Sequence, residues 1–390
     1  MAVAVTNKIT KTMLRKFILL ALISLNLSSQ AAVLPEDRAD IMYHRYEGGG
    51  VTIDGPSLLI RKDFASTVSV SANYYVDSVS SASIDVETSG ASRYSEERTE
   101  YSLTADYLYD KAILSAGYTN SEENDYQADT YYFGVSQDFF GDLTTITLGY
   151  SRGDDTVMQN GNDLFKDQLD RQNYRFGISQ IATANLIVNV NYEVVTEEGY
   201  LNNPYRSYRY IDPTNPNNTI SETEIYPATR TSDAVSLGAR YFLPYRAALS
   251  GNYRYFSDDW DIKAQTFTLG YTHPIGNDWI LDFTYRFYQQ DNAFFYSDLH
   301  DFQSVDSKDF RARDKELSEF SNQTFGIGVS YQFQLGNSEI FDKSSINLQY
   351  DFIQFDYDNF RDIRNSSTPG DEPLYSFDAN VLRLFFSIWY

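Results

Sequence analysis

The sequence contains no cysteine, only three histidines, and no apolar run long enough to cross a membrane as a helix. Without cysteine there is no disulfide framework, so the fold must be held by packing or by a closed ladder of hydrogen bonds. Basic residues are also few, with 31 against 54 acidic residues and a formal net charge of −23. This acidity argues against a nucleic-acid partner, because phosphates repel an acidic surface.

The longest apolar run, from Phe17 to Leu27, is too short to span a bilayer but suits the core of a signal peptide. The chain before it holds no acid and four basic residues: Lys8, Lys11, Arg15 and Lys16. Small residues at Ser29 and Ala31 predict cleavage after Ala31, so residues 1–31 are expected to be a cleaved secretory signal peptide. Removing four cations from the 31 leaves 27 basic against 54 acidic side chains, a net charge of −27 for the mature chain.

Aromatic residues are abundant, with 33 Tyr and 26 Phe, and several lie in the last stretch, Asn380 to Tyr390. Its alternate residues form one continuous apolar face: Leu382, Leu384, Phe386, Ile388 and Tyr390. Arg383 and Ser387 interrupt the other face, and this period of two is typical of a β-strand. The pattern favours the closing strand of a membrane β-barrel. The alternative is an edge strand of a soluble sandwich.

The rest of the chain favours the barrel, because from about residue 66 it alternates between strand-like segments of about 9 to 13 residues, short turns and long polar loops. The short turns include Asp110-Lys111 and Gly141-Asp142, and the long loops include Glu198 to Arg230 and Asp291 to Ser321. Sorting the connections by length gives 14 strands with both ends at the short-turn side, as outer-membrane barrels require. We therefore expect an all-β, antiparallel, up-and-down transmembrane barrel over residues 66–390, with 14 strands or, alternatively, 16.

The segment 32–65 is expected to be a short N-terminal plug or periplasmic arm. The triplet Gly48-Gly49-Gly50 resembles a hinge, and Pro56 interrupts the following stretch. The pattern leaves open whether Thr52 to Lys62 belongs to a plug, an arm or an additional strand.

One register of the predicted strands faces lipid and the other faces a wet interior. The lipid register carries a Tyr near the far end of each ascending strand, as an interfacial aromatic girdle requires: Tyr74, Tyr118, Tyr150, Tyr192, Tyr255, Tyr285 and Tyr350. A second ring is expected at the opposite interface: Tyr107, Tyr241, Tyr271, Trp279 and Tyr390. The alternate register is polar, for example Ser69, Ser71 and Asn73.

The same alternation places charged residues inside the barrel. An Arg between two aromatic residues recurs at Arg175, Arg254 and Arg286, so each guanidinium points inward while its neighbours face lipid. With further inward charges they predict a constriction of both signs that sieves polar solutes: Arg98, Glu100, Arg175, Glu193, Arg254, Arg286 and Asp351. The alternative is that these charges pair and fill a closed lumen.

The loops are rich in acid, as at Glu96-Glu97 and Glu122-Glu123-Asn124-Asp125. Clustered carboxylates are ligands that hard cations prefer, but no stretch has the spacing of a known calcium loop. A solvated acidic surface is therefore the first interpretation, and no cofactor is expected. Divalent cations bound at the acidic loops, where they would bridge lipopolysaccharide, are the functional alternative.

Catalysis has few candidate residues, because barrel hydrolases use His with Asp or Ser. His273 precedes a short turn and His44 lies in the N-terminal segment. Only His300, flanked by Asp298 and Asp301, stands in a long loop where an acid/base pair could form. We expect no enzyme, with a hydrolase using His300 as the residual alternative.

Several stretches resemble the bacterial family known as domain of unknown function 3570, over nearly the whole mature chain: Glu36-Asp37-Arg38 with the following glycines, Asp77 to Ser83, the loop motif from Gly199 to Arg206, Tyr226 to Thr231, Tyr253 to Trp260 and Tyr285 to Asp298. The resemblance implies an exported envelope protein of a Gram-negative bacterium and brings no activity. The external-loop motif is expected to shape a selective mouth: Tyr200, Asn202, Asn203, Pro204, Tyr205 and Arg206.

These observations together predict an outer-membrane channel or transporter for a small polar solute. The alternative is a nonconducting envelope component that recruits partners through its long loops or N-terminal arm, and an outer-membrane enzyme is third. The expected partners are outer-membrane lipid and lipopolysaccharide, the barrel-assembly machinery, periplasmic chaperones and a small polar solute.

Overall fold

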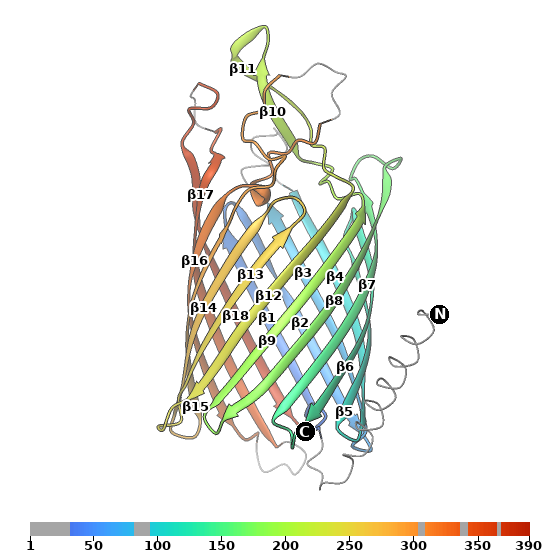
Figure 1. Cartoon of the computed structure of the whole chain (residues 1–390), viewed down its shortest axis with the longest axis vertical. Coiled ribbons are helices and arrows are strands. Elements are labelled where there is room, and N and C mark those ends of the chain that lie inside the picture. Colours follow the sequence, from blue (N-terminus) through green and yellow to red (C-terminus); the bar gives the residue numbers. More distant parts are fainter. Residues whose placement is uncertain (1–31, 82–93, 303–308, 336–341, 365–367) are drawn as a thin grey trace, which may run out of the picture.

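The computed structural model describes residues 32–81, 94–302, 309–335, 342–364 and 368–390, which form a closed antiparallel barrel topped by folded loops (Figure 1). The barrel has 16 strands, the larger of the two expected numbers. Among the described residues, no helix is both long and apolar enough to cross a membrane. The predicted signal peptide, residues 1–31, lies outside them.

Each barrel strand pairs with its neighbours in chain order, except that β9 pairs with β12 because β10 and β11 form a separate hairpin. The elements are β1 (Arg38–Gly48), β2 (Val51–Phe64), β3 (Val68–Ser81), β4 (Tyr94–Tyr109), β5 (Ala112–Glu122), β6 (Tyr126–Phe139), β7 (Thr144–Met158), β8 (Lys166–Thr183), β9 (Leu186–Gly199), β10 (Ser207–Asp212), β11 (Asn215–Thr223), β12 (Thr229–Phe242), β13 (Ala248–Asp258), β14 (Lys263–Ile275), β15 (Trp279–Gln290), the 3₁₀ helix η1 (Lys315–Leu317), β16 (Phe320–Phe333), β17 (Lys343–Arg361) and β18 (Leu374–Trp389).

The expectation of a plug or arm over residues 32–65 is wrong for most of that segment, because β1 and β2 belong to the barrel wall. β1 pairs with β18 on one side and with β2 on the other, so this hairpin closes the barrel. Gly49 and Gly50 form its tight turn with φ of 58° and 80°, a conformation that favours glycine. Gly55 and Pro56 interrupt the β2–β3 ladder, since Pro lacks the N–H that a ladder needs. The glycines of this turn and Pro56 were interpreted as signs of a hinge and an interruption, and for this reason β1 and β2 were not predicted as wall strands.

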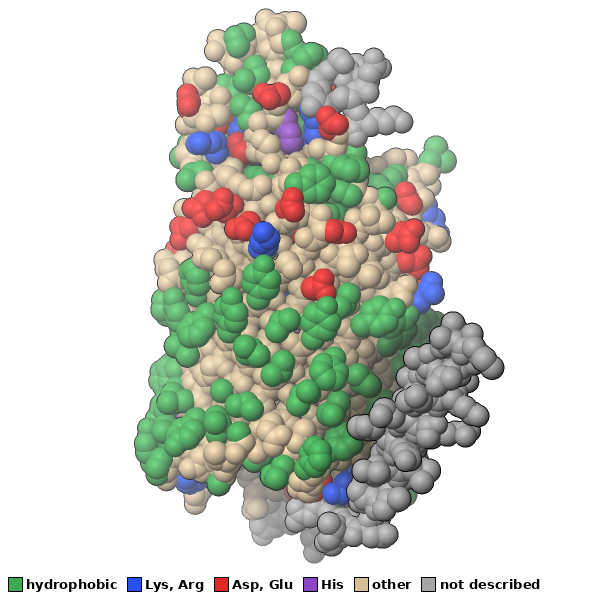
Figure 2. Space-filling view, in the orientation of Figure 1, with side chains coloured by type: hydrophobic (Ala, Val, Ile, Leu, Met, Phe, Trp, Pro, Cys, Tyr) green, Lys and Arg blue, Asp and Glu red, His purple; other side chains and the backbone are tan. Residues whose placement is uncertain are grey.

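The outward register is apolar, as predicted. Leu103, Phe133 and Leu237 are each more than half exposed on the barrel surface. Figure 2 shows hydrophobic side chains over the barrel wall, with acidic and basic side chains gathered toward the long-loop end. This is the surface that the hydrocarbon core of a bilayer covers.

Aromatic residues pair across neighbouring strands near both ends of this apolar wall. Toward the long loops, the rings of Tyr74 and Tyr101 lie 5.1 Å apart, and those of Tyr118 and Tyr131 lie 5.2 Å apart. Toward the short turns, Trp279 and Tyr331 lie 4.6 Å apart. We take the stretch between these two levels as the membrane-spanning part of each strand.

Candidate functional site

The predicted constriction residues lie on the inner face of the barrel, but in three groups instead of one ring. The first group joins β8, β9 and β13 around a single carboxylate. Arg175 Nε lies 3.0 Å from Glu193 Oε1, and Arg254 Nη2 lies 3.4 Å from Glu193 Oε2. Arg175 and Glu193 are direct partners in the β8–β9 register, so strand pairing itself brings them together. Glu193 is thus shared by two guanidinium groups.

The second group lies on β4, where Arg98 and Glu100 point to the same face because side chains alternate along a strand. Arg98 Nη2 lies 2.6 Å from Glu100 Oε2, and Arg98 Nε donates to Ser121 Oγ at 2.9 Å. Arg98 also lies 3.8 Å from Glu123 in the turn between β5 and β6. Arg98 therefore links the barrel wall to the turn between β5 and β6.

The third group is formed by Asp351 on β17 and Arg383 on β18, which make an ion pair. Arg383 was recognised as an interruption of the closing strand but was not predicted as a lumen residue.

Arg286 on β15 differs from the other arginines predicted for the constriction. Within the described part of the chain it has no ion-pair partner, and its guanidinium carbon lies 5.8 Å from the ring of Tyr288.

A cavity of about 810 Å³, which we call the outer chamber, lies between the strand ends and the long loops. Its wall combines acids, arginines and aromatic rings from strands between β4 and β15 and from four of the connections between barrel strands. Arg171 pairs with Glu197 at 2.8 Å on one side, and Arg230 pairs with Asp258 at 2.7 Å on another. Arg230 also lies over the ring of Trp260, at 4.7 Å. The chamber thus offers polar contacts next to flat apolar surfaces.

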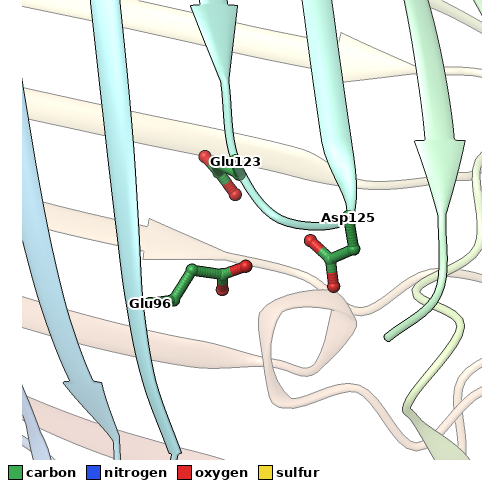
Figure 3. Close-up of side chains that lie close together, drawn as sticks. All are labelled: Glu96, Glu123 and Asp125. Atoms are coloured by element: carbon green, nitrogen blue, oxygen red, sulfur yellow. The ribbon is translucent and has the colours of Figure 1, made fainter. Parts of the chain in front are cut away.

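Three carboxylates meet at one edge of the outer chamber: Glu96, Glu123 and Asp125 (Figure 3). One oxygen from each lies within 4.8 Å of the others. Glu96 lies five residues beyond the girdle residue Tyr101 along β4, outside the membrane-spanning part. Burial, followed by the charges of Asp125 and Glu123, raises the pKa of Glu96 to about 7. Burial also raises the pKa of Glu123, against the effect of Arg98.

This trio comes from the two acidic stretches noticed in the sequence, which the β4–β5 pairing brings together. With one oxygen each, the three carboxylates supply three of the six to eight oxygens that Ca²⁺ takes. Binding of divalent cations at the acidic loops therefore stays a prediction. The trio places Glu96, with its raised pKa, at the edge of the chamber.

A second cavity of about 530 Å³, the inner chamber, lies against the inner face of β15 to β18. On β15, Thr284 and Arg286 line it, whereas Tyr288 and Gln290 line the outer chamber. The inner chamber is therefore displaced along the barrel away from the long loops.

The predicted loop motif forms a strap across the mouth, defined by residues Tyr200 to Arg206. Asn202 Nδ2 donates to the Glu224 carbonyl at 2.7 Å, and its Oδ1 accepts from the Tyr226 amide at 3.1 Å.

The strap also contacts other connections between strands. Tyr205 donates to Asp125, and Arg206 makes an ion pair with Asp314. Strap residues also line the outer chamber, and their role in a selective mouth stays a prediction.

Above the strap, the loops pack into a cap with its own apolar core, which includes Trp260, Phe295, Phe360 and Tyr375. The cap also holds a buried ionic network. Arg209 pairs with both Asp298 and Glu372, and Arg313 pairs with Asp298 at 2.9 Å. Burial alone would raise the pKa of Glu372, but hydrogen bonds from Arg209 and from backbone amides lower it. Three long loops are thereby tied together.

Among the residues that the structure describes, His300 and a carboxylate do not come together as an acid/base pair. The imidazole Nε2 lies 3.0 Å from the Ala312 carbonyl, and the neighbouring Asp298 is engaged by Arg209 and Arg313. Burial lowers the pKa of His300, which packs edge-on to Tyr208. The absence of enzymatic activity stays a prediction.

Sequence reasoning missed a buried pair between His44 on β1 and Asp77 on β3. His44 Nε2 lies 2.7 Å from Asp77 Oδ1, and Tyr75 stacks on the imidazole at 4.9 Å. His44 had been assigned to an arm, so no strand register placed it opposite Asp77. Recognition of β1 as a wall strand would have supplied that signal.

Comparison with known proteins gives one sequence family. The family model described as "Protein of unknown function (DUF3570)" matches residues 87–351, in agreement with the resemblance seen in the motifs. No curated protein matches this sequence.

Solved structures of similar shape are bacterial membrane proteins with very different sequences. A bacterial polysaccharide outer membrane secretin is 8% identical, with a TM-score of 0.47 and coverage of 91% of this chain and 99% of its own. The outer membrane protein opdK from Pseudomonas aeruginosa is 10% identical, with a TM-score of 0.43 and coverage of 91% and 99%. A Pseudomonas aeruginosa FadL homologue is 10% identical, with a TM-score of 0.42 and coverage of 92% and 90%.

Proposed function

This chain belongs to the DUF3570 family of proteins of unknown function, and we propose from its own geometry that it is an outer-membrane channel or transporter for a small polar solute. A barrel of 16 strands is wide enough to enclose an aqueous path. In barrels of eight strands, by contrast, side chains alone fill the interior. The apolar wall and its aromatic pairs suit a bilayer, and the long loops face outward in this proposal.

The observation that carries the proposal is the exposure of the charged side chains inside the barrel. The side chains of Arg175, Arg254 and Arg98 are 57%, 39% and 38% exposed although all three take part in ion pairs. A lumen filled by its own side chains would bury these groups, because packed interiors leave little room for water. Exposed pairs of both signs next to open chambers favour a wet path that selects polar solutes.

Conductance of purified protein in a planar bilayer tests this proposal. We expect ion-conducting openings from the parent protein. The double variant Arg175→Ser with Arg254→Ser leaves Glu193 without its cations, so conductance and cation preference should both rise. The control is Arg152→Ser, which removes an Arg that pairs with Asp154 and Asp170 and is 51% exposed.

Two outcomes would count against a channel. A silent parent protein, combined with a double variant that no longer folds, would indicate a filled lumen, in which an unpaired buried carboxylate costs roughly 3 to 5 kcal/mol. Unchanged conductance and selectivity in a folded double variant would place the selective site elsewhere.

A nonconducting envelope component that recruits partners is the second candidate, and the β10–β11 hairpin favours it. The hairpin stands away from the barrel (Figure 1), and every residue of β11 is exposed. Replacing Ile211 to Thr219 by a two-residue Asn-Gly turn, next to the paired residues Tyr210 and Ile220, removes its tip. If the protein is a channel, this variant should conduct as the parent does. If the protein recruits partners through the hairpin, the variant should lose its function in the envelope.

A further inference from the structure

Within the described chain, Arg286 is an arginine of the inner chamber without a counter-ion. Each of the other arginines predicted for the constriction, Arg98, Arg175 and Arg254, lies within 4 Å of a carboxylate. Arg286 has no such neighbour in the part of the chain that the structure describes, yet its side chain lines the chamber. A guanidinium carries five N–H donors in a planar fork that matches an oxyanion.

Two further polar groups in the same wall have unused hydrogen-bonding capacity. Thr324 is the direct partner of Arg286 in the β15–β16 register and is only 8% exposed. Its Oγ1 is buried and has no hydrogen-bond partner within the described chain. Arg383 engages Asp351 through Nη2, but its Nε is likewise buried and unpartnered there. Buried polar groups without partners are uncommon in folded proteins, so these two groups beside the exposed guanidinium of Arg286 point to a ligand.

Neither acid of the chamber, Asp282 or Asp351, forms an ion pair with Arg286 in the described part of the chain. Asp351 is paired with Arg383, and Asp282 accepts a hydrogen bond from Thr272 Oγ1 at 2.6 Å. The nearby Asp77 is paired with His44. Asp282 keeps its charge, because a hydroxyl donor does not neutralise a carboxylate, so two acids balance two arginines over the whole chamber. Arg286 is nevertheless left without a described carboxylate partner, and its guanidinium can hold a negative group.

The shape of the chamber adds an apolar side. Met42, Ile353 and Val381 line it together with the polar groups. Gly326 keeps the wall open, because a Cβ at this position would overlap a carboxylate oxygen of Asp351. The chamber can thus receive a small molecule with an anionic head and a short apolar body.

We propose that the inner chamber binds the oxyanion group of a small organic anion between Arg286, Thr324 and the Nε edge of Arg383. The head is a carboxylate or a phosphate, which the Arg286 fork holds by charge-assisted hydrogen bonds. This inference rests on the proposed channel function for its biological role and identifies a class of solute for it. Binding itself requires only the folded barrel.

The test uses purified full-length mature protein in detergent, with sodium butyrate, sodium phosphate or sodium chloride at equal ionic strength. Isothermal titration measures binding. We expect binding of at least one oxyanion and none of chloride. Arg286→Gln should weaken it at least about tenfold and Thr324→Val by about three- to tenfold, since each removes a donor. The matched control is Thr147→Val, the same change on β7, seven strands away around the barrel, which should bind as the parent does.

The outcomes separate the site from the channel. Binding of butyrate alone identifies a carboxylate site, and binding of phosphate alone identifies a phosphate site. Equal binding by the parent and by folded Thr324→Val and Arg286→Gln would overturn the proposal, as would binding no stronger than that of chloride. If Arg286→Gln fails to fold, Thr324→Val still decides. A protein that binds butyrate but never conducts keeps the site and rejects the channel, whereas a conducting protein with no oxyanion binding does the reverse.

Discussion

Tyr205 donates its phenolic hydroxyl to the carboxylate of Asp125, 80 residues earlier in the chain. The same oxygen accepts the backbone N–H of Asn160 at 2.7 Å. One side chain of the strap therefore joins the loop between β9 and β12 to the β5–β6 turn and to the β7–β8 loop. This contact also fixes the strap against the acidic trio.

Tyr205→Phe should loosen the strap without changing its apolar packing. A hydrogen bond to a charged group contributes about 1.5 to 3 kcal/mol, so local opening should become roughly 10- to 100-fold more frequent. The measurement is the rate of proteolytic cleavage within residues 200–206 on intact cells. Tyr109→Phe, at the short-turn end, is the control. Equal cleavage of both variants and the parent would show that this hydrogen bond does not hold the strap.

The selectivity of the outer chamber should depend on pH through Glu96. Its pKa of about 7 means that this carboxyl is largely neutral at pH 6 and charged at pH 8, so cation preference should rise over that interval. Glu96→Gln should remove this dependence, whereas the exposed neighbour Glu97→Gln should keep it. Reversal potentials in asymmetric salt measure the effect, and an unchanged pH profile in Glu96→Gln would contradict it.

The raised pKa of Glu96 also affects stability. Rising pH should increase cation preference but decrease the contribution of Glu96 to the stability of the fold. Because the folded-state pKa of Glu96 is raised from 4.5, the folded protein holds this proton more tightly than the unfolded chain does. The contribution of Glu96 is therefore fully present below about pH 4.5 and is lost as pH rises through about 7. The difference in unfolding temperature between parent and Glu96→Gln should follow this window.

Breaking the ionic network of the cap should be costly. Arg209→Met leaves Asp298 without one of its cations and Glu372 without its ion-pair partner, in side chains no more than 9% exposed. We expect a loss of roughly 3 to 5 kcal/mol, confined to the loops. Arg152→Met breaks exposed pairs and should cost at most about 1 kcal/mol. Limited proteolysis of the loops, with barrel folding followed by gel mobility, would distinguish them. Equal protection of both variants would contradict the expected cost.

The β1–β2 hairpin should be essential for the barrel. Unboiled parent protein should run faster on a detergent gel than boiled protein, because a closed barrel resists mild detergent. Deleting residues 38–64 removes two wall strands, so this difference should disappear. The variant with Asn-Gly in place of Ile211 to Thr219, which shortens a hairpin outside the wall, should preserve it. A deletion of 38–64 that still shows the fast-running form would restore the idea of a plug or arm.

The seven hairpins from β3 to β18 were predictable because alternation of apolar and polar residues survives in any membrane wall that faces lipid on one side and water on the other. The predicted short turn Asp110-Lys111 agrees with the structure, where it joins β4 to β5. The closing strand begins earlier than the sequence pattern indicates, because β18 starts at Leu374 and the recognised stretch starts at Asn380. Above the membrane both faces are wet, and the alternation that marks a strand fades.

The candidate site was predictable only in part. Residue parity placed Arg175, Glu193 and Arg254 inside the barrel, but which side chains meet depends on strand register, which sequence pattern does not fix between distant hairpins. The contacts within the cap could not be predicted from the sequence for the same reason. Arg209, Asp298 and Glu372 come from three loops, and no periodic pattern relates such loops to one another.

The pairing of β1 with β18 makes the order of assembly part of this fold. Arg38 lies opposite Trp389, so the last ladder of the barrel joins strands separated by nearly the whole described chain. Closing so long a loop carries a large entropic cost before any contact offsets it, and such high contact order slows folding. Until β1 and β18 meet, each has an unpaired edge exposed. The time between insertion of the central hairpins and this final pairing is therefore when the chain is most exposed to aggregation and most dependent on assistance.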